Sequence, residues 1–233
     1  MTSFNKLKRK NETAIFLGCG PSINQLSEDD ITKINKMDVW CNNNFIINND
    51  IIPNFYHLEV KAHRNGALIT DLVNKKQEAY KDVTWVLDGS RPYLLKFIKP
   101  SVFENIFCYM KSMGGNNGDY ELKPNHVTVS CVASLTCVLD VMARMGYKKI
   151  YMAGVDLNSS EYFWTDNEKY ADTNIPAIMN SCKPDERKAD SIHPTSERNI
   201  QQFIKDFGIH KGIEIINLSK DSLLTKYLET ETL

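Results

Sequence analysis

Short runs of apolar residues alternate along this chain with segments in which apolar residues recur at helical spacing. The short runs predict buried strands at residues 13–17, 39–41, 54–60, 83–87, 149–155 and 214–217. The segments of helical spacing predict helices that begin after Ser27 and near Ser222 and that span residues 65–80, 130–145 and 196–207. Strands that alternate with helices predict an α/β fold, a mostly parallel sheet with helices on both faces.

The length and composition predict a single domain over residues 1–233. The chain is 42% apolar and 24% charged, which is typical of a globular protein with a sizeable core. Residues 157–192 differ from the rest, because they are polar, rich in aromatic residues and without a sustained period. We expect them to form a lid-like insertion in a Rossmann-like nucleotide-binding domain.

Charge and cysteine usage narrow the class of protein. The 28 basic and 29 acidic residues are interspersed, which argues against a nucleic-acid partner. No apolar run reaches the ~20 residues that a transmembrane segment needs. The six cysteines form no C-x-x-C pair, and the first ten residues lack the apolar core of a signal peptide. These features predict a cytoplasmic protein, and they leave homo-oligomer formation open.

A glycine-containing loop, Gly18-Cys19-Gly20-Pro21-Ser22, follows the first predicted strand. In open α/β sheets this position presents backbone N–H groups to an anion, which favours a nucleotide phosphate. A dinucleotide site would need a third glycine where Ile23 stands and an acidic residue after the second strand. The chain has Asn42-Asn43-Asn44 there, so we exclude a nicotinamide dinucleotide. A simple tight turn remains the alternative for the glycine loop.

Polar and aromatic side chains elsewhere are candidates for recognition and catalysis. The asparagines after the second strand can both donate to and accept from a ribose, a base or a phosphate, although such segments are often turns. His193 titrates near neutral pH and is the candidate general base, and a surface role is its alternative. The candidates for stacking, or for a small satellite core, are Tyr162, Phe163, Trp164 and Tyr170. No Cys or His partner stands at metal-ligand spacing from His193, which predicts no metal site.

Four segments, in order, resemble the bacterial sialyltransferases of glycosyltransferase family 42, which use CMP-sialic acid. They are residues 18–22, residues 41–45, the passage from Ser134 to Asp156, and His193-Pro194-Thr195-Ser196 followed by Ser222-Leu223-Leu224. The chain departs from the family pattern at Cys19, where an asparagine is expected, and at Leu157 and Asn158, where a tyrosine is expected.

The resemblance implies a CMP-activated donor, a glycan or small-molecule acceptor, and no cofactor besides the donor. It implies that His193 deprotonates the acceptor hydroxyl and that Tyr162 donates a hydrogen bond to the departing phosphate in place of a metal. The nucleotide-binding residues that it implies are Gly18, Cys19, Gly20, Ser22, Asn42, Asn43, Ser134, Gly154 and Asp156.

Three functions remain open at this stage. The first is inverting transfer of an acidic sugar, sialic acid or a related one, from CMP to an acceptor hydroxyl. The second is pyrophosphoryl transfer from ATP to a 6-hydroxymethylpterin-type alcohol, because the resemblance extends to pterin pyrophosphokinases as well as to flagellin-modifying proteins. This reaction needs Mg²⁺, and Asp156 is almost alone as a well-placed carboxylate. The third is a non-catalytic nucleotide-binding module, which the departures at Cys19 and Leu157 favour.

Overall fold

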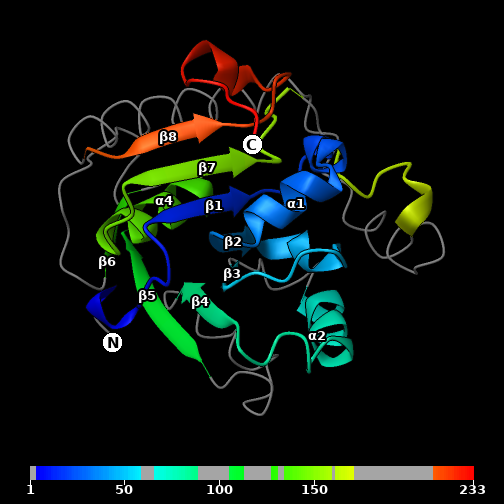
Figure 1. Ribbon diagram of the computed structural model, residues 1–233. Helices are drawn as coiled ribbons and strands as arrows, with labels where there is room; N and C mark the ends of the chain where they lie inside the picture. Colours follow the sequence, from blue (N-terminus) through cyan, green and yellow to red (C-terminus); the bar gives the residue numbers. More distant parts are fainter. Residues whose placement is uncertain are drawn as a thin grey trace.

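The computed structural model describes residues 4–58, 66–88, 105–112, 127–130, 134–158, 161–170 and 212–233. Its eight strands form one sheet in the order β6-β5-β4-β3-β2-β1-β7-β8, and all neighbouring strands are parallel (Figure 1). The strands are β1 (Thr13–Leu17), β2 (Asp38–Asn42), β3 (Phe55–Leu58), β4 (Thr84–Asp88), β5 (Ile106–Ser112), β6 (Val127–Ser130), β7 (Lys149–Ala153) and β8 (Glu214–Asn217). The predicted α/β fold with a parallel sheet is confirmed.

The strand order reverses between β1 and β7. From β1 the chain adds β2 to β6 on one side, and then it returns to place β7 and β8 on the other side. Leu17, the last residue of β1, pairs with Cys41 of β2 and with Ala153 of β7. Such a reversal separates the loops at the carboxyl ends of two neighbouring strands, and this is where open α/β sheets bind ligands.

Alternate side chains of the strands point to opposite faces of the sheet, and each face has its own core. Ile15 and Leu17 pack with α1 (Glu28–Ile34), α2 (Gly66–Lys75) and the 3-10 turn η3 (Asn43–Ile47). The core of the other face contains Ala14 and Phe16 of β1, six residues of α4 (Ser134–Arg144) and Phe4 of the N-terminal turn η1 (Phe4–Lys6). Figure 1 shows α1 in front of the sheet and α4 behind it. The sheet is thus covered on both faces, as predicted.

Local sequence signals set several element boundaries. Ser27 caps α1 through a capping box, because its side chain accepts from the Asp30 N–H and the Asp30 carboxylate accepts from the Ser27 N–H. Gly146, with φ +85°, follows the end of α4 as predicted. None of the described helices is long and apolar enough to cross a membrane.

Other boundaries differ from the predictions. β7 ends at Ala153 and not at residue 155, because Gly154 turns the chain with φ +70°. The helix predicted near Ser222 is the short 3-10 turn η6 (Leu223–Lys226), for which Ser222 provides the cap. β5 and β6 were not predicted from the sequence. The helix predicted at 196–207 lies outside the described residues.

Candidate functional site

The glycine loop after β1 packs directly against the loop after β7. The Gly18 N–H donates to the carbonyl of Ala153, and the Gly20 N–H donates to the carbonyl of Gly154, each at 2.8 Å. A Cβ atom at Gly18 would lie 2.3 Å from the Gly154 oxygen, and one at Gly20 would lie 2.3 Å from Oδ2 of Asp156. The two glycines are therefore required for close contact between the loops.

Ser22, the last residue of the glycine loop, connects the carboxyl ends of β1, β7 and β8. Its N–H donates to Oδ2 of Asp156 at 3.0 Å, and its Oγ accepts from the Gly154 N–H at 3.1 Å. The same Oγ lies 2.7 Å from Oγ of Ser219, which follows β8. We expected the amides of Gly18, Gly20 and Ser22 to face a phosphate, but all of them donate to protein acceptors. The loop holds three strand ends together.

The Asp156 carboxylate is a buried acidic group at this edge, with a relative exposure of 7%. Its Oδ2 accepts from Ser22, whereas its Oδ1 is buried and has no hydrogen-bond partner among the described residues. Leaving a buried polar atom unpaired costs about 1–3 kcal/mol, and more when it is charged. The unpaired oxygen therefore indicates a site for a hydrogen-bond donor that a ligand brings.

The asparagines after β2 lie beside the glycine loop and reach the start of α4. The Cys19 Sγ is 3.8 Å from the carbonyl of Asn42, which ends β2. The side-chain amide of Asn43 donates to Oγ of Ser134, the first residue of α4, at a long 3.5 Å. Neutral donors and acceptors from β2 and α4 thus meet at the edge of the sheet that also carries the glycine loop.

Cys19 is a poor nucleophile in this setting. Its side chain is half-buried between the loops, and the loss of hydration there raises the pKa of the thiol to about 12. The thiol therefore stays protonated near neutral pH, whereas the thiolate is the reactive form. Its position suits a neutral packing role in the loop, with its backbone carbonyl available to a neighbouring segment.

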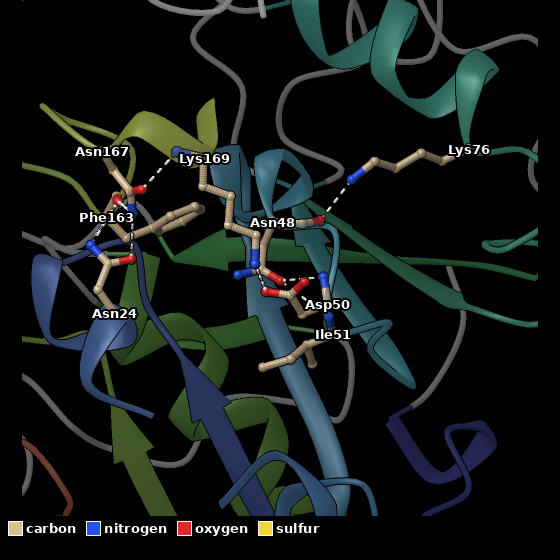
Figure 2. A network of polar contacts seen from close by, with 8 residues as sticks. All are labelled: Asn24, Asn48, Asp50, Ile51, Lys76, Phe163, Asn167 and Lys169. Carbon is tan, nitrogen blue, oxygen red and sulfur yellow. Dashed lines mark hydrogen bonds and ion pairs between the residues drawn. The ribbon is translucent and has the colours of Figure 1, made fainter. Parts of the chain in front are cut away.

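Residues 161–170 dock on the glycine loop through backbone and amide contacts (Figure 2). The Phe163 N–H donates to the Cys19 carbonyl at 3.0 Å, and the Asn24 side chain donates to the Phe163 carbonyl at 2.8 Å. Phe163 and Trp164 are buried in the core of the α1 face, so their alternative as a small satellite of the core is confirmed. This segment is the described part of the predicted lid, and residues 171–192 lie outside the described residues.

Tyr162 stands apart from its buried neighbours. It is half-buried, and its ring stacks on Trp164 with a centroid distance of 4.5 Å and an interplanar angle of 9°. Its N–H donates to Oγ1 of Thr165 at 3.1 Å. The stack fixes the plane of the phenol next to the loop contact of Phe163, which places Tyr162 near the glycine loop.

Polar contacts connect residues 161–170 to the turn after η3. Asn167 donates to Oδ1 of Asn24 at 3.1 Å, and Lys169 forms an ion pair with Asp50. Figure 2 shows these contacts running from Asn24 across the segment to Asp50 and Asn48. Residues 161–170 therefore connect the glycine loop with the turn after η3.

Two cavities flank the glycine loop. One of about 280 Å³ lies between Ser22, Ser219 and the C-terminal residues 231–233. The other, of about 180 Å³, lies beside these polar contacts and is lined by Asn24, Asp50, Asn167 and Lys169 among others. Of these two, neither is lined by Asp156, Asn43 or Ser134. The convergence of polar groups, more than cavity size, marks the candidate site, because hydrogen-bonding chemistry decides what a nucleotide site can hold.

Comparison with known proteins supports the assignment of the fold. No protein-family model and no curated protein sequence matches the chain. The sialyltransferase CstII from Campylobacter jejuni, in complex with the substrate analogue CMP-3FNeuAc, is 12% identical with a TM-score of 0.52, covering 94% of this chain and 85% of that one. CstII in complex with a trisaccharide acceptor and CMP is 13% identical with a TM-score of 0.55, and the same shares of the two chains are covered. The Campylobacter jejuni α-2,3-sialyltransferase Cst-I is 16% identical with a TM-score of 0.51, covering 96% and 82%.

The chain has the fold of these sialyltransferases. The resemblance that the four sequence segments indicated is thereby confirmed at the level of the fold, across nearly the whole chain. At 12–16% identity, the role of each residue must come from this chain's own geometry.

The structure brings most of the predicted site residues to one edge of the sheet. Contacts connect nine of them: Gly18, Cys19, Gly20, Ser22, Asn42, Asn43, Ser134, Gly154 and Asp156. His193 lies outside the described residues. Sequence reasoning missed Ser219, which contacts Ser22, and Asn24, which contacts Phe163. Only Ser219 had a signal, since it directly follows a predicted strand end.

Proposed function

We propose that this chain is a sialyltransferase-like enzyme that transfers an acidic sugar from a CMP-activated donor to an acceptor hydroxyl with inversion. The observation that carries the proposal is the unpaired, buried Oδ1 of Asp156, which lies at the strand reversal together with the Asn43 and Ser134 side chains. The shared fold with proteins whose structures contain CMP supports the same interpretation.

The chemistry of this edge suits the nucleoside part of a donor. A ribose hydroxyl or a cytosine amino group would donate to Oδ1 of Asp156 and remove the cost of the unpaired oxygen. A phosphate at that point would be repelled by the carboxylate. Asn43 and Ser134 add neutral groups that both donate and accept, which is what a base edge and a ribose require.

The proposed transfer proceeds in one displacement. The acceptor oxygen attacks the anomeric carbon as the bond from that carbon to the CMP phosphate oxygen breaks, and the configuration inverts. His193 takes the acceptor's proton, and the Tyr162 hydroxyl donates to the departing phosphate. A phenol at this place would make a metal unnecessary. Independence from metals and further cofactors, and a cytoplasmic location, stay predictions.

Binding and turnover measurements test the proposal. Calorimetric titration with CMP, ATP and GTP, with and without Mg²⁺, should show binding of CMP that does not require the metal. Incubation with CMP-sialic acid and a panel of glycan acceptors should release CMP. Tight binding of ATP only with Mg²⁺ would favour the pyrophosphokinase, and nucleotide binding without turnover on any donor would favour the non-catalytic module.

A histidine variant tests the mechanism. His193→Ala should lower turnover by ~10² or more, the scale of a lost general base, while the dissociation constant of CMP stays within a few-fold. His126→Ala is the matched control, since the sequence assigns no role to that histidine. Equal turnover in the two variants would remove His193 from the mechanism.

A further inference from the structure

The hydroxyl of Tyr56 holds the turn that follows β2. Tyr56 lies in β3 and is fully buried. Its hydroxyl donates to the carbonyl of Asn43 at 2.6 Å and accepts from the N–H of Ile46 at 2.6 Å. A side chain from the neighbouring strand thus satisfies two backbone groups of η3, the turn that begins with Asn43.

Asn43 needs such support because its backbone is left-handed, with φ +46°. This region costs an ordinary residue ~1–2 kcal/mol, somewhat less for asparagine, so the surroundings must select it. The conformation sets the direction of the side chain, whose amide reaches Oγ of Ser134 across the edge of the sheet. The Tyr56 hydroxyl accordingly acts on the backbone of a residue whose side chain faces the start of α4.

The surroundings of Tyr56 keep its hydroxyl in place and protonated. Its ring packs against Trp85 with a centroid distance of 4.9 Å and against Tyr80 at 6.1 Å. Burial raises the pKa of Tyr56 well above its usual value, so the phenol remains a donor at any physiological pH. At the far end of η3, Lys76 donates to the carbonyl of Ile46. It also donates to the carbonyl of Asn48 at 2.6 Å (Figure 2).

We propose that Tyr56 is a positioning residue for nucleotide recognition, because its hydroxyl holds Asn43 in the conformation that aims the asparagine side chain at the site. The proposal rests on the proposed function, in which Asn43 contacts the donor nucleotide. Tyr56, a core residue that touches no ligand, thereby contributes to the selectivity of nucleotide binding.

The first test needs no ligand. A crystal structure of Tyr56→Phe should show Asn43 with a negative φ and its side-chain amide no longer within hydrogen-bond distance of Ser134. The phenyl ring keeps the packing against Trp85 and Tyr80, so the core should remain intact. An unchanged left-handed Asn43 in this variant would overturn the proposal.

The second test measures CMP binding by calorimetry. Tyr56→Phe should weaken binding roughly fivefold to tenfold, the scale of one lost hydrogen bond. In an Asn43→Ala background, the same change should have almost no further effect, because both variants remove one interaction. Additive losses would show that the hydroxyl does not act through Asn43, and they would overturn the proposal.

Two control variants separate positioning from stability. Tyr80→Phe removes a neighbouring buried hydroxyl that has no hydrogen-bond partner among the described residues, so it should change nothing. Tyr147→Phe removes a buried hydroxyl that donates to Asp38, the first residue of β2 at the opposite edge of the sheet. It should lower the urea midpoint as Tyr56→Phe does, with unchanged CMP affinity.

The control outcomes decide between the two proposals. If Tyr147→Phe weakens CMP binding as much as Tyr56→Phe, the effect follows global stability and the role of Tyr56 in positioning fails. If the wild-type protein binds no CMP, the proposed function fails. The proposal for Tyr56 is then decided by the Asn43 geometry in the Tyr56→Phe crystal structure alone.

Discussion

The loop after β1 and the turn after β2 lie side by side at one edge of the sheet, and they are built in opposite ways. In the glycine loop the backbone makes the contacts, since the N–H groups of Gly18, Gly20 and Ser22 all donate to the β7 side. In η3, the turn after β2, side chains of other elements hold the backbone, and the Asn43 side chain reaches Oγ of Ser134.

The two regions therefore differ in role: the glycine loop sets the distance between strand ends, and the turn after β2 supplies groups that can recognise a ligand. Glycines allow the loops after β1 and β7 to touch, which fixes the distance between two strand ends but leaves few groups for a ligand. The Asn43 turn and Asp156 supply the hydrogen-bonding groups that remain for one. A Gly-x-Gly-Pro sequence after a strand is thus a weak sign of phosphate contact on its own, because the same residues serve close packing.

The largest effect is expected from filling the contact between the loops. In Gly154→Ala, the new Cβ would lie 2.6 Å from the Gly18 oxygen and 2.7 Å from the Ile23 side chain, at a residue with φ +70°. Overpacking and the left-handed backbone together should cost ~3 kcal/mol or more of unfolding free energy. Urea denaturation followed by far-UV circular dichroism measures it.

Gly146→Ala provides the matched control. Gly146 also has a positive φ, at +85°, but a Cβ there would meet no atom within 4 Å. The substitution should therefore cost only the ~1–2 kcal/mol of the backbone conformation. Equal losses in the two variants would mean that the close approach of the loops contributes nothing measurable.

The next effect is a trade between stability and affinity at Asp156. In Asp156→Asn, the amide oxygen can still accept from the Ser22 N–H, while the NH₂ group replaces the unpaired Oδ1. The unliganded protein should be as stable or up to ~1 kcal/mol more stable, because a buried charged oxygen is removed. CMP affinity should fall about tenfold, since the ligand's donor loses its acceptor.

Thermal unfolding and calorimetry on the same preparation test this trade. A loss of stability without a change in CMP affinity would show that Oδ1 serves the fold and not the ligand. Ser222→Ala is a suitable comparison, because Ser222 is also buried at this edge and its hydroxyl donates to the Val155 carbonyl. It should lose stability without a comparable loss of affinity.

The two regions should also respond to alkaline pH with opposite signs. Burial raises the pKa of Cys19 to about 12 from 9.0, so above pH 9 the folded chain holds a proton that the unfolded chain loses. This contribution to stability is therefore lost as pH rises. Burial lowers the pKa of Lys76 to about 8 from 10.5, so between these values the unfolded chain holds the extra proton and stability rises with pH.

Urea midpoints at pH 8, 9 and 10 separate these contributions. Between pH 9 and 10, Cys19→Ala should make the change in stability with pH less negative, and Lys76→Met should make it more negative. The slope, and not the absolute stability, is the quantity to compare, since both substitutions also alter packing. Parallel curves of stability against pH for the wild type and both variants would show that neither Cys19 nor Lys76 contributes to the pH dependence.

The sequence predicted elements whose signals are local. A five-residue apolar run ended by glycine defined β1, and the Ser27 capping box defined the start of α1, because neither depends on distant residues. β5 was missed although the run from Ile106 to Met110 is apolar and a segment rich in glycine and asparagine follows it.

The candidate site could be predicted only in part, for a physical reason. Residue types indicated Asn43 and the resemblance indicated Asp156, but the partners of the glycine-loop amides lie more than 130 residues away in the chain. Local sequence therefore could not tell whether those amides face a ligand or protein. The left-handed backbone of Asn43 and its support by Tyr56 likewise arise from the pairing of β2 with β3.

The smallest expected effect concerns the hydroxyl pair that ties the glycine loop to β8. Ser22 was predicted to contact the nucleotide, but its hydroxyl lies between the Gly154 N–H and Ser219. Ser219→Ala leaves the Gly154 contact intact and removes only the second partner, so it should cost about 1 kcal/mol of unfolding free energy. Ser22→Ala should cost more, because it also leaves the buried Gly154 N–H unpaired. If Ser22 acts by holding the strand ends, both variants should weaken CMP binding less than Asn43→Ala does. Calorimetry in which Ser22→Ala loses as much CMP affinity as Asn43→Ala would instead make that hydroxyl a direct ligand contact.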